Sequence, residues 1–287
     1  MNKKIYLTID DSPSKDFRSN LDYLIEHNIP AVFFCIGERM EAGWEDLKYA
    51  ISKGYLIGNH SYSHPHFSDL DLESAKQEIQ KTDALIERLY QEAGQPYYDR
   101  LFRFPYGDKG DGKYGYQFMT RDEAEELKQS RFDKFVKWIS NLHPVDNQIN
   151  KLEEEQKGAL AEELQRYLFQ LGYVRGDLVG VDYDFFHPLS TDQDWSWSFD
   201  IGEWRWDEKQ NQDAYLAQIK ERLESDKPED YRGEVREKTG MQQKDKIDLV
   251  LFHDRDVSNA FFKPVIDMLV EMDVEFLPTD YDQIKRT

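Results

Sequence analysis

The chain has 287 residues and carries 37 lysines and arginines against 57 aspartates and glutamates, a formal net charge of −20. No basic run interrupts this acidic composition, which argues against nucleic acid and anionic membranes as partners. Its one cysteine, Cys35, lies in an apolar run and excludes an intramolecular disulfide. A chain of this length fits a single α/β barrel domain with an insertion, because such barrels commonly run about 200–250 residues.

Membrane and targeting signals are also missing from the sequence. No stretch approaches the roughly 20 apolar residues that span a bilayer, and the N-terminus lacks the apolar core of a signal peptide. We therefore expect no membrane insertion and a cytoplasmic location for the chain as given, with a trimmed secreted form as the alternative. The sequence leaves the oligomeric state open.

The first hundred residues alternate between predicted strands and predicted helices. Residues 4–9 alternate apolar and polar side chains and predict a strand that ends at two aspartates. Further elements follow in chain order: a helix over 20–27, a strand over 31–36, a helix over 44–52, a strand over 55–59, a helix over 72–92 and a strand over 101–103. This alternation favours a parallel, barrel-like sheet.

The alternation breaks after Gly107. Residues 108–115 are rich in glycine and aspartate, and residues 120–171 predict two amphipathic helices that separate near Pro144. We expect residues 108–171 to form a mainly helical insertion within one domain that spans 1–287. The barrel pattern then resumes with predicted strands over 178–184, 247–254 and 274–277 and a helix over 260–271.

Two neighbouring carboxylates and two histidines stand out as groups that can bind a metal ion. Asp10 and Asp11 close the first predicted strand, where side chains of a parallel barrel point to its active face. His60 and His64 are four residues apart, a spacing that places both imidazoles on one side of a helical turn. Two histidines and one carboxylate match the ligand set of a catalytic zinc site with an open position for water. Position 61 is Ser61 rather than the glutamate of a zincin motif, so Asp10 is the obvious general base.

Five segments carrying these and other polar residues follow one another along the chain. They are residues 8–13 (TIDDSP), 60–64 (HSYSH), 103–107 (RFPYG), the aspartates of 184–194 with Trp195, and 251–253 (LFH). This order resembles the polysaccharide deacetylases with the NodB homology domain, carbohydrate esterase family 4. The resemblance implies a distorted (β/α) barrel of the NodB type and removal of acetyl groups, foremost N-acetyl, from a sugar, oligosaccharide or polysaccharide.

The resemblance also implies a separate role for each of these residues. A divalent ion, usually zinc, with cobalt or another divalent ion as alternatives, would be held by Asp11, His60 and His64. Asp10 would act as general base, and Arg103 would orient it and stabilise its charge. The chemistry agrees, because a metal ion can polarise a carbonyl and activate water but a separate base and acid must move the protons.

The general acid implied by the resemblance is His253, at the end of a late predicted strand. Its carboxylate partner is open, because the fourth segment is longer than in the family; we favour Asp184, at a predicted strand end, over Asp192. The remaining implied groups are the oxyanion donor and the walls of the acetyl pocket: the backbone N–H of Tyr106 and the side chains of Trp195 and Leu251.

Other functions fit parts of the pattern. Two histidines and one carboxylate also hold iron in non-haem oxygenases, which do not need Asp10 or His253. A hydrolase of another non-peptide C–N bond on the same fold and a non-catalytic carbohydrate-binding protein are further alternatives. We expect His66 and His187 to lie outside the site, and most tryptophans of residues 195–206 to pack in the core.

Overall fold

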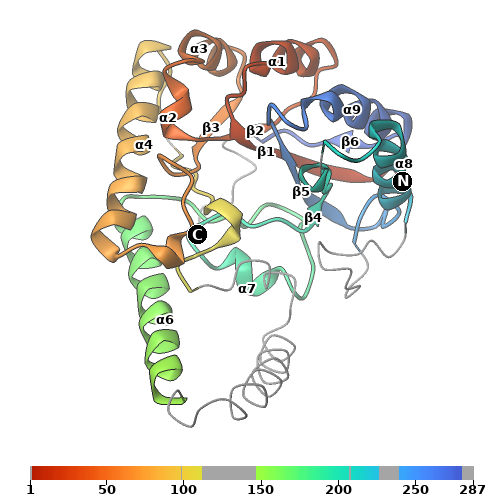
Figure 1. Ribbon diagram of the computed structural model, residues 1–287. Coiled ribbons are helices and arrows are strands. Elements are labelled where there is room, and N and C mark those ends of the chain that lie inside the picture. The colour runs from red at the N-terminus through yellow and green to blue at the C-terminus, as the bar shows by residue number, and fades with distance from the viewer. Residues whose placement is uncertain (1, 98, 112–146, 207, 226–238, 280–287) are drawn as a thin grey trace.

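Figure 1 shows the computed structural model, which describes residues 2–97, 99–111, 147–206, 208–225 and 239–279. Its centre is a six-stranded sheet with the order β3-β2-β1-β5-β4, in which β6 also pairs with β1. The strands are β1 (Lys4–Ser12), β2 (Val32–Cys35), β3 (Leu56–Asn59), β4 (Phe199–Asp200), β5 (Ile247–His253) and β6 (Glu275–Phe276). Each pairing within this sheet is parallel, as the alternation of strands and helices predicts.

The register of the sheet brings the ends of distant strands together. Asp10 of β1 lies opposite His253 of β5, and Cys35 of β2 lies opposite Asn59 of β3. Because parallel strands end at the same edge, the residues that follow β1, β3 and β5 all emerge on one face of the molecule.

Two irregular segments continue the sheet where regular strands are absent. Phe102 forms an isolated parallel bridge with Asn59, where a strand over 101–103 is predicted. The N–H of Trp195 donates to the carbonyl of Phe102 (2.7 Å), and the N–H of Ser198 donates to that of Leu249 in β5 (2.8 Å). Residues 195–200 thus connect the two edges of the sheet, which gives a distorted barrel and confirms the predicted fold class.

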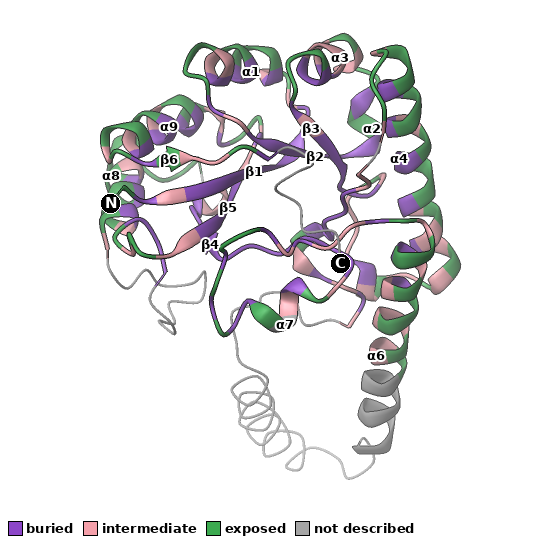
Figure 2. Cartoon of the chain, turned by 180° about the vertical axis from the view of Figure 1, so that it is seen from behind, coloured by how far each residue is buried: buried purple, intermediate pink, exposed green. Residues whose placement is uncertain are grey.

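Most helices cover the outside of this sheet, whereas the helix of residues 147–170 extends away from it (Figures 1 and 2). The α-helices are α1 (Phe17–Glu26), α2 (Gly37–Met40), α3 (Trp44–Ser52), α4 (Leu72–Glu92), α6 (Asn147–Gln170), α7 (His187–Ser190), α8 (Gln212–Glu224) and α9 (Phe262–Glu271). Short 3₁₀ turns are η1 (Phe67–Asp69), η2 (Pro105–Gly107), η3 (Glu203–Arg205) and η4 (Asn259–Phe261). The bounds predicted for α3 and α4 agree with the structure. Helix α4 begins where the Asp71 carboxylate accepts a hydrogen bond from the N–H of Ser74 (2.7 Å), a common N-cap.

The two faces of β1 separate two apolar clusters. Ile5, Leu7 and Ile9 pack with the inward faces of α1, α3, α4 and α9 in the larger cluster. Tyr6 points to the opposite face, as the two-residue period of a strand requires, and packs with Trp195 and other apolar side chains of residues 178–197. Figure 2 shows the buried sides of the helices turned toward the sheet.

One predicted strand is wrong. Residues 178–184 form turns instead, with Gly180 at φ +85° and the N–H of Val181 donating to the carbonyl of Leu178 (3.3 Å). Tyr183 is buried in the second cluster while Asp184 is exposed. A loop packed against a core therefore produces the same alternation of apolar and polar residues as a strand.

Part of the predicted insertion is visible as α6, which corresponds to the second of its two predicted helices. The first predicted helix lies in residues 112–146, outside the described residues, so the extent of the insertion over 108–171 stays a prediction.

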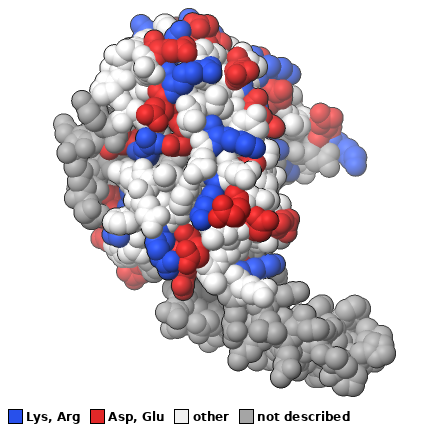
Figure 3. Space-filling view, turned by 90° about the vertical axis from the view of Figure 1, so that its left-hand side faces the viewer, with Lys and Arg blue, Asp and Glu red and all other residues white. Residues whose placement is uncertain are grey.

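No helix in the described part of the chain combines the length and apolar composition that crossing a bilayer requires. On the face in Figure 3, acidic and basic side chains are intermixed, without a continuous basic patch.

Candidate active site and metal centre

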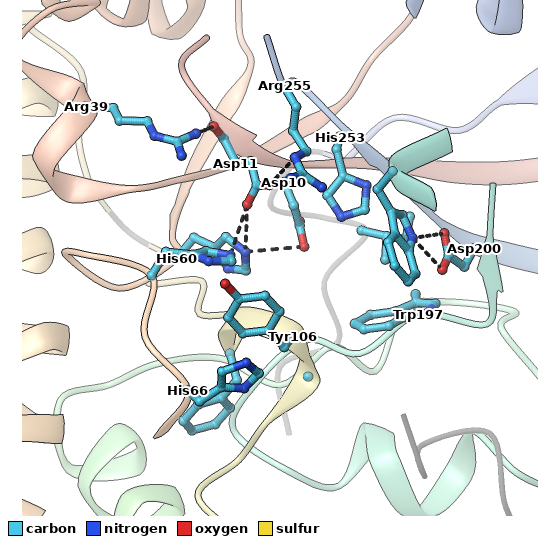
Figure 4. A pocket seen from close by; sticks show the side chains of 15 residues that line it. Asp10, Asp11, Arg39, His60, His66, Tyr106, Trp197, Asp200, His253 and Arg255 are labelled. Atoms are coloured by element: carbon cyan, nitrogen blue, oxygen red, sulfur yellow. Dashed lines mark hydrogen bonds and ion pairs between the residues drawn. The ribbon is translucent and has the colours of Figure 1, made fainter. Parts of the chain in front are cut away.

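A pocket of about 400 Å³ opens at the face where β1, β3 and β5 end. Residues far apart in the sequence line it: Asp10, Asp11, Arg39, His60, His64, His66, Phe104, Tyr106, Gly107, Trp197, Asp200, Trp204, Leu251, His253 and Arg255. Figure 4 shows these side chains converging from several elements. The lining includes most of the residues that the sequence singles out, but not Arg103, Asp184 or Trp195.

Three of these side chains form a set that suits a metal ion. One ligand atom each from Asp11, His60 and His64 lies within 4.8 Å of the other two. Asp11 Oδ1 is 3.5 Å from His60 Nε2 and 3.1 Å from His64 Nε2, yet this buried oxygen accepts no hydrogen bond from the described residues. A buried carboxylate oxygen without a donor, facing two imidazole nitrogens, fits a divalent cation with nitrogen and oxygen ligands.

The loop after β3, rather than a helical turn, presents the two histidines. Ser61 and His64 have positive φ angles of 65° and 59°, so the expectation of a helical turn over residues 60–64 is wrong. The N–H of His64 donates to Ser61 Oγ (3.1 Å), and Glu78 of α4 accepts hydrogen bonds from the N–H groups of Tyr62 and Ser63 (3.0 and 2.7 Å). These bonds hold a strained loop that aims both imidazoles at Asp11.

A hydrogen bond fixes the tautomer of His60. Its Nδ1 lies 2.8 Å from the carbonyl oxygen of Arg103. Because a carbonyl only accepts hydrogen bonds, Nδ1 carries a proton, and Nε2 is the ring nitrogen that faces Asp11. Metal-binding histidines in proteins are generally oriented in this way.

The protonation states also suit a metal site. Burial by itself raises the pKa of Asp11, but His60 and His64 outweigh it and hold that pKa well below its usual range. Burial lowers the pKa of His64, although Asp11 partly opposes the shift. Near neutral pH the set therefore offers a charged carboxylate and a neutral imidazole, the forms that bind cations.

The second aspartate has a different partner. Asp10 Oδ1 accepts a hydrogen bond from Arg103 Nη1 (2.7 Å), and the Arg103 side chain is only 1% exposed. Three further bonds fix this guanidinium, to Thr8 Oγ1 (2.8 Å) and to the carbonyls of Trp195 and Ser196 (both 2.9 Å). Asp10 thus lies in the pocket beside His60, 3.6 Å from Nε2, with its orientation set by a buried cation.

The structure overturns the predicted partner of His253. Its Nδ1 lies 2.7 Å from Glu203 Oε1, a buried carboxylate of η3, whereas Asp184 is exposed because residues 178–184 form no strand. Asp192, the other candidate, pairs with Lys109 instead (2.7 Å). The sequence signal for Glu203 was weak, since it follows a two-residue strand and lies fifty positions from its partner.

The Glu203 carboxylate controls the charge of His253. Burial by itself lowers the pKa of His253, but the charge of Glu203 and its hydrogen bond, helped by Asp11 and Asp10, raise that pKa to about 9. Burial likewise raises the pKa of Glu203, and His253 counteracts this shift. At neutral pH His253 is therefore a protonated imidazole that lines the pocket and can donate through Nε2.

The aromatic walls of the pocket differ from expectation. Trp195 is fully buried and donates through Nε1 to the carbonyl of Val174 (3.1 Å), so its side chain does not reach the pocket. Trp197 lines the pocket instead, together with Leu251 and Tyr106. His66, expected outside the site, also lines it and stacks on Tyr106 with ring centroids 3.9 Å apart.

Comparison with known proteins agrees with the geometry of the pocket. Residues 1–127 match the family model described as polysaccharide deacetylase. The chain is 37% identical over 106 residues to a peptidoglycan-N-acetylglucosamine deacetylase of Bacillus cereus, a match that covers 37% of each protein. It is 34% identical over 85 residues to a chitooligosaccharide deacetylase of Rhizobium leguminosarum, which covers 29% of this chain and 40% of that protein. The matches thus span less than half the length of these two relatives.

A solved structure extends the likeness to the whole fold. The polysaccharide deacetylase Bc1974 of Bacillus cereus superposes with a TM-score of 0.56 at 19% identity, covering 99% of this chain and 96% of the other. Residues 1–127, the part that matches the polysaccharide deacetylase model, contain β1 to β3 and most of the pocket residues. The resemblance drawn from the sequence motifs is confirmed.

Proposed function

We propose that this protein is a metal-dependent deacetylase that hydrolyses an N-acetyl group of a sugar, oligosaccharide or polysaccharide. One observation carries the proposal: a single pocket holds the ligand set of Asp11, His60 and His64 next to the carboxylate of Asp10 and a protonated His253. The names of the two relatives, which refer to peptidoglycan N-acetylglucosamine and to chitooligosaccharide, support an acetamido sugar as substrate.

Asp11, His60 and His64 would hold the ion, zinc foremost, with cobalt as the usual substitute. A divalent ion bound there supplies a Lewis acid that activates water and polarises the acetyl carbonyl. The protein side chains then have to manage the protons, which a metal ion does not move.

Asp10 would accept the proton of the attacking water. Its Oδ1 is engaged by Arg103, which leaves Oδ2 toward His60 and the pocket. The buried guanidinium supplies the countercharge, so the carboxylate stays aligned while the proton arrives.

His253 would donate a proton to the leaving amine nitrogen. Its raised pKa keeps the imidazole protonated at neutral pH, and Glu203 on Nδ1 directs Nε2 as the donor.

The backbone N–H of Tyr106 would stabilise the negative oxygen, and Leu251 with Trp197 would enclose the acetyl methyl group. Tyr106 has a positive φ of 58°, a strained conformation typical of functional positions.

The test is acetate release by the zinc-reconstituted protein from N-acetylglucosamine oligomers, the monosaccharide and acetylated xylan. We expect zinc-dependent release from at least one N-acetylated saccharide. Absence of release from all of them, with the metal bound, would contradict the proposal and point to another non-peptide C–N bond or to carbohydrate binding alone. Oxygen consumption would instead indicate the iron chemistry that the same ligand set allows.

A further inference from the structure

Two arginines lie at the mouth of the pocket and have no place in the proposed reaction. Arg39 belongs to α2 and Arg255 follows β5, and Figure 4 shows them on the two sides of Asp11. Arg39 Nη1 donates to the backbone carbonyl of Asp11 (3.0 Å), and Arg255 Nε lies 3.3 Å from Asp11 Oδ2. Both guanidinium groups are thereby held next to the proposed metal ligand.

The charges of the pocket are distributed unequally between its depth and its mouth. The carboxylates Asp10, Asp11 and Asp200 are only 3%, 6% and 5% exposed. Asp10 is paired with Arg103, and Asp200 accepts hydrogen bonds from Trp204 Nε1 (3.0 Å) and from a backbone N–H. The arginines are the accessible charges, since Arg39 is exposed and the Arg255 side chain is 37% exposed. A ligand entering the pocket therefore meets positive charge, although the whole chain carries −20.

The contact of Arg255 with Asp11 leaves most of its donors available. Its ion pair with Asp11 runs through Nε, and the described residues provide no other ion pair for this side chain. A guanidinium has five N–H donors, and its two terminal nitrogens form the fork that binds a carboxylate with two parallel hydrogen bonds. The ion pair through Nε therefore fixes the plane of the Arg255 guanidinium, in which its two terminal nitrogens lie.

We propose that Arg255, assisted by Arg39, selects acetamido-sugar substrates that carry a carboxylate close to the acetyl group. This inference rests on the proposed deacetylase function and specifies its substrate class. Arg255 touches Asp11, so the bound anion lies within one side-chain length of the reaction centre. A carboxylate on the same sugar, as a lactyl ether, or on the adjoining sugar, as a uronic acid, lies within this reach.

The first test compares substrates that differ in charge alone. An oligosaccharide whose acetamido sugars carry lactyl carboxylates is compared with its methyl ester, and an oligosaccharide of alternating acetamido sugar and uronic acid is compared with its own ester. We expect kcat/KM of the zinc-loaded protein to be about 10- to 100-fold higher for one free acid than for its ester, the range of a charge-assisted hydrogen bond pair. The pair that shows the preference identifies the position of the carboxylate. Equal kcat/KM for acid and ester in both pairs would overturn the inference.

Variants then assign the preference to the arginines. Arg255→Gln should lose most of the preference through a higher KM for the acid, whereas Arg255→Lys, which keeps the charge without the fork, should keep part of it. Arg39→Gln should reduce the preference for the acid less than Arg255→Gln does. Arg18→Gln, an exposed position on α1 outside the pocket, is the matched control and should leave the ratio unchanged. An equal loss for acid and ester in Arg255→Gln would show that Arg255 only positions Asp11, and would contradict the assignment.

A binding measurement separates this inference from the proposed function. In an Asp10→Asn background, calorimetry at saturating zinc measures the Kd of acid and ester without turnover. Tighter binding of the acid that disappears in Asp10→Asn/Arg255→Gln supports anion selection, even if the wild-type protein releases no acetate. Equal binding of acid and ester contradicts it, even if the protein proves to be an active deacetylase.

Discussion

Asp10 and Asp11 are neighbours in the sequence, yet the structure gives them different partners. Asp10 faces a buried arginine, and Asp11, with a positive φ of 66°, turns its Oδ1 to two imidazoles. A strand would send adjacent side chains to opposite faces. The left-handed conformation of Asp11 brings both carboxylates into one pocket, as their proposed roles of metal ligand and general base require.

This division predicts different consequences for the two aspartates. Asp10→Asn should lower kcat about 10²- to 10⁴-fold, the usual cost of losing a proton-transfer group, because an amide cannot accept the proton. The same variant should still bind zinc, since its oxygen is not among the three ligand atoms. Asp11→Asn should lose zinc binding. Acetate release and zinc titration of both variants check the prediction, and loss of zinc by Asp10→Asn would refute the separation of roles.

The pair of His253 and Glu203 predicts the pH dependence of the reaction. The pKa of His253, raised to about 9, keeps the general acid protonated below that pH, so the rate should fall as the pH rises through this value. Glu203→Gln removes the negative charge that raises the pKa of His253. The burial of His253, which lowers that pKa, remains. The alkaline limb of kcat should therefore move toward lower pH.

The control is Asp184→Asn, which removes the partner favoured from sequence but changes an exposed side chain. Its pH profile of kcat should match the wild type. A shift in Asp184→Asn but not in Glu203→Gln would reverse the assignment made from the structure.

At the scale of elements, the end of β3 and the loop of residues 60–64 depend on one buried amide. Asn59 Nδ2 donates to the carbonyl of Ile79 in α4 (2.9 Å) and to the Tyr173 hydroxyl (2.7 Å), and Oδ1 accepts from the N–H of Ser61 (2.9 Å). The side chain thus joins α4, the segment after α6 and the first turn of the histidine loop. Because Asn59 directly precedes His60, its hydrogen bonds also fix the position of a proposed metal ligand.

Asn59→Ala should therefore weaken both stability and zinc binding. It leaves buried polar groups without partners, which costs about 1–3 kcal/mol in the free energy of unfolding. Urea unfolding of the metal-free protein measures this loss, and zinc titration measures the effect on the loop. Gln91→Ala, at an exposed position of α4, should stay within about 0.5 kcal/mol of wild type. Equal stability of the two variants would contradict the role of Asn59.

Elements with strong periodicity were predictable, and those set by tertiary contacts were not. Helices α3 and α4 carry apolar stripes with the helical period, so their sequences determine their bounds. The alternation of residues 4–9 predicts the presence of β1 but not its end, because the strand continues through an irregularity to Ser12. Residues 178–184 alternate like a strand only because a core covers one side of a loop. Strand β4 has two residues, too few for any periodic pattern to show.

At the scale of the whole molecule, the site was predictable as a set of residues but not as a set of contacts. Motif order places Asp10, Asp11, His60, His64 and His253 near one edge of a parallel sheet. The particular partner of a side chain depends instead on loops that pack across the barrel. Glu203 replaces Asp184 as the partner of His253 because residues 178–184 form turns rather than the predicted strand. Trp197 replaces Trp195 in the pocket because the Trp195 side chain is fully buried and bonded to Val174.

The proposed metal ligands come from β1 and from the loop after β3. A bound ion would connect these two elements, so zinc binding should stabilise the fold. Zinc at 100 times its Kd should raise the free energy of unfolding by about 2.7 kcal/mol at neutral pH. The gain should fade as the pH falls, because protons compete with zinc for His60 and His64. Thermal unfolding with and without zinc measures the gain, and an equal gain in His64→Ala would place the ion elsewhere.

The central claim is that Asp11, His60 and His64 hold the ion that the deacetylation requires. The most direct test is acetate release from an N-acetylglucosamine oligomer, measured while zinc is titrated into metal-stripped protein. We predict that the rate rises with bound zinc and levels off when each chain holds one ion, whereas His64→Ala stays inactive at the same zinc concentrations. Acetate release by the stripped wild-type protein at the full rate, or by His64→Ala at the wild-type rate, would contradict the claim.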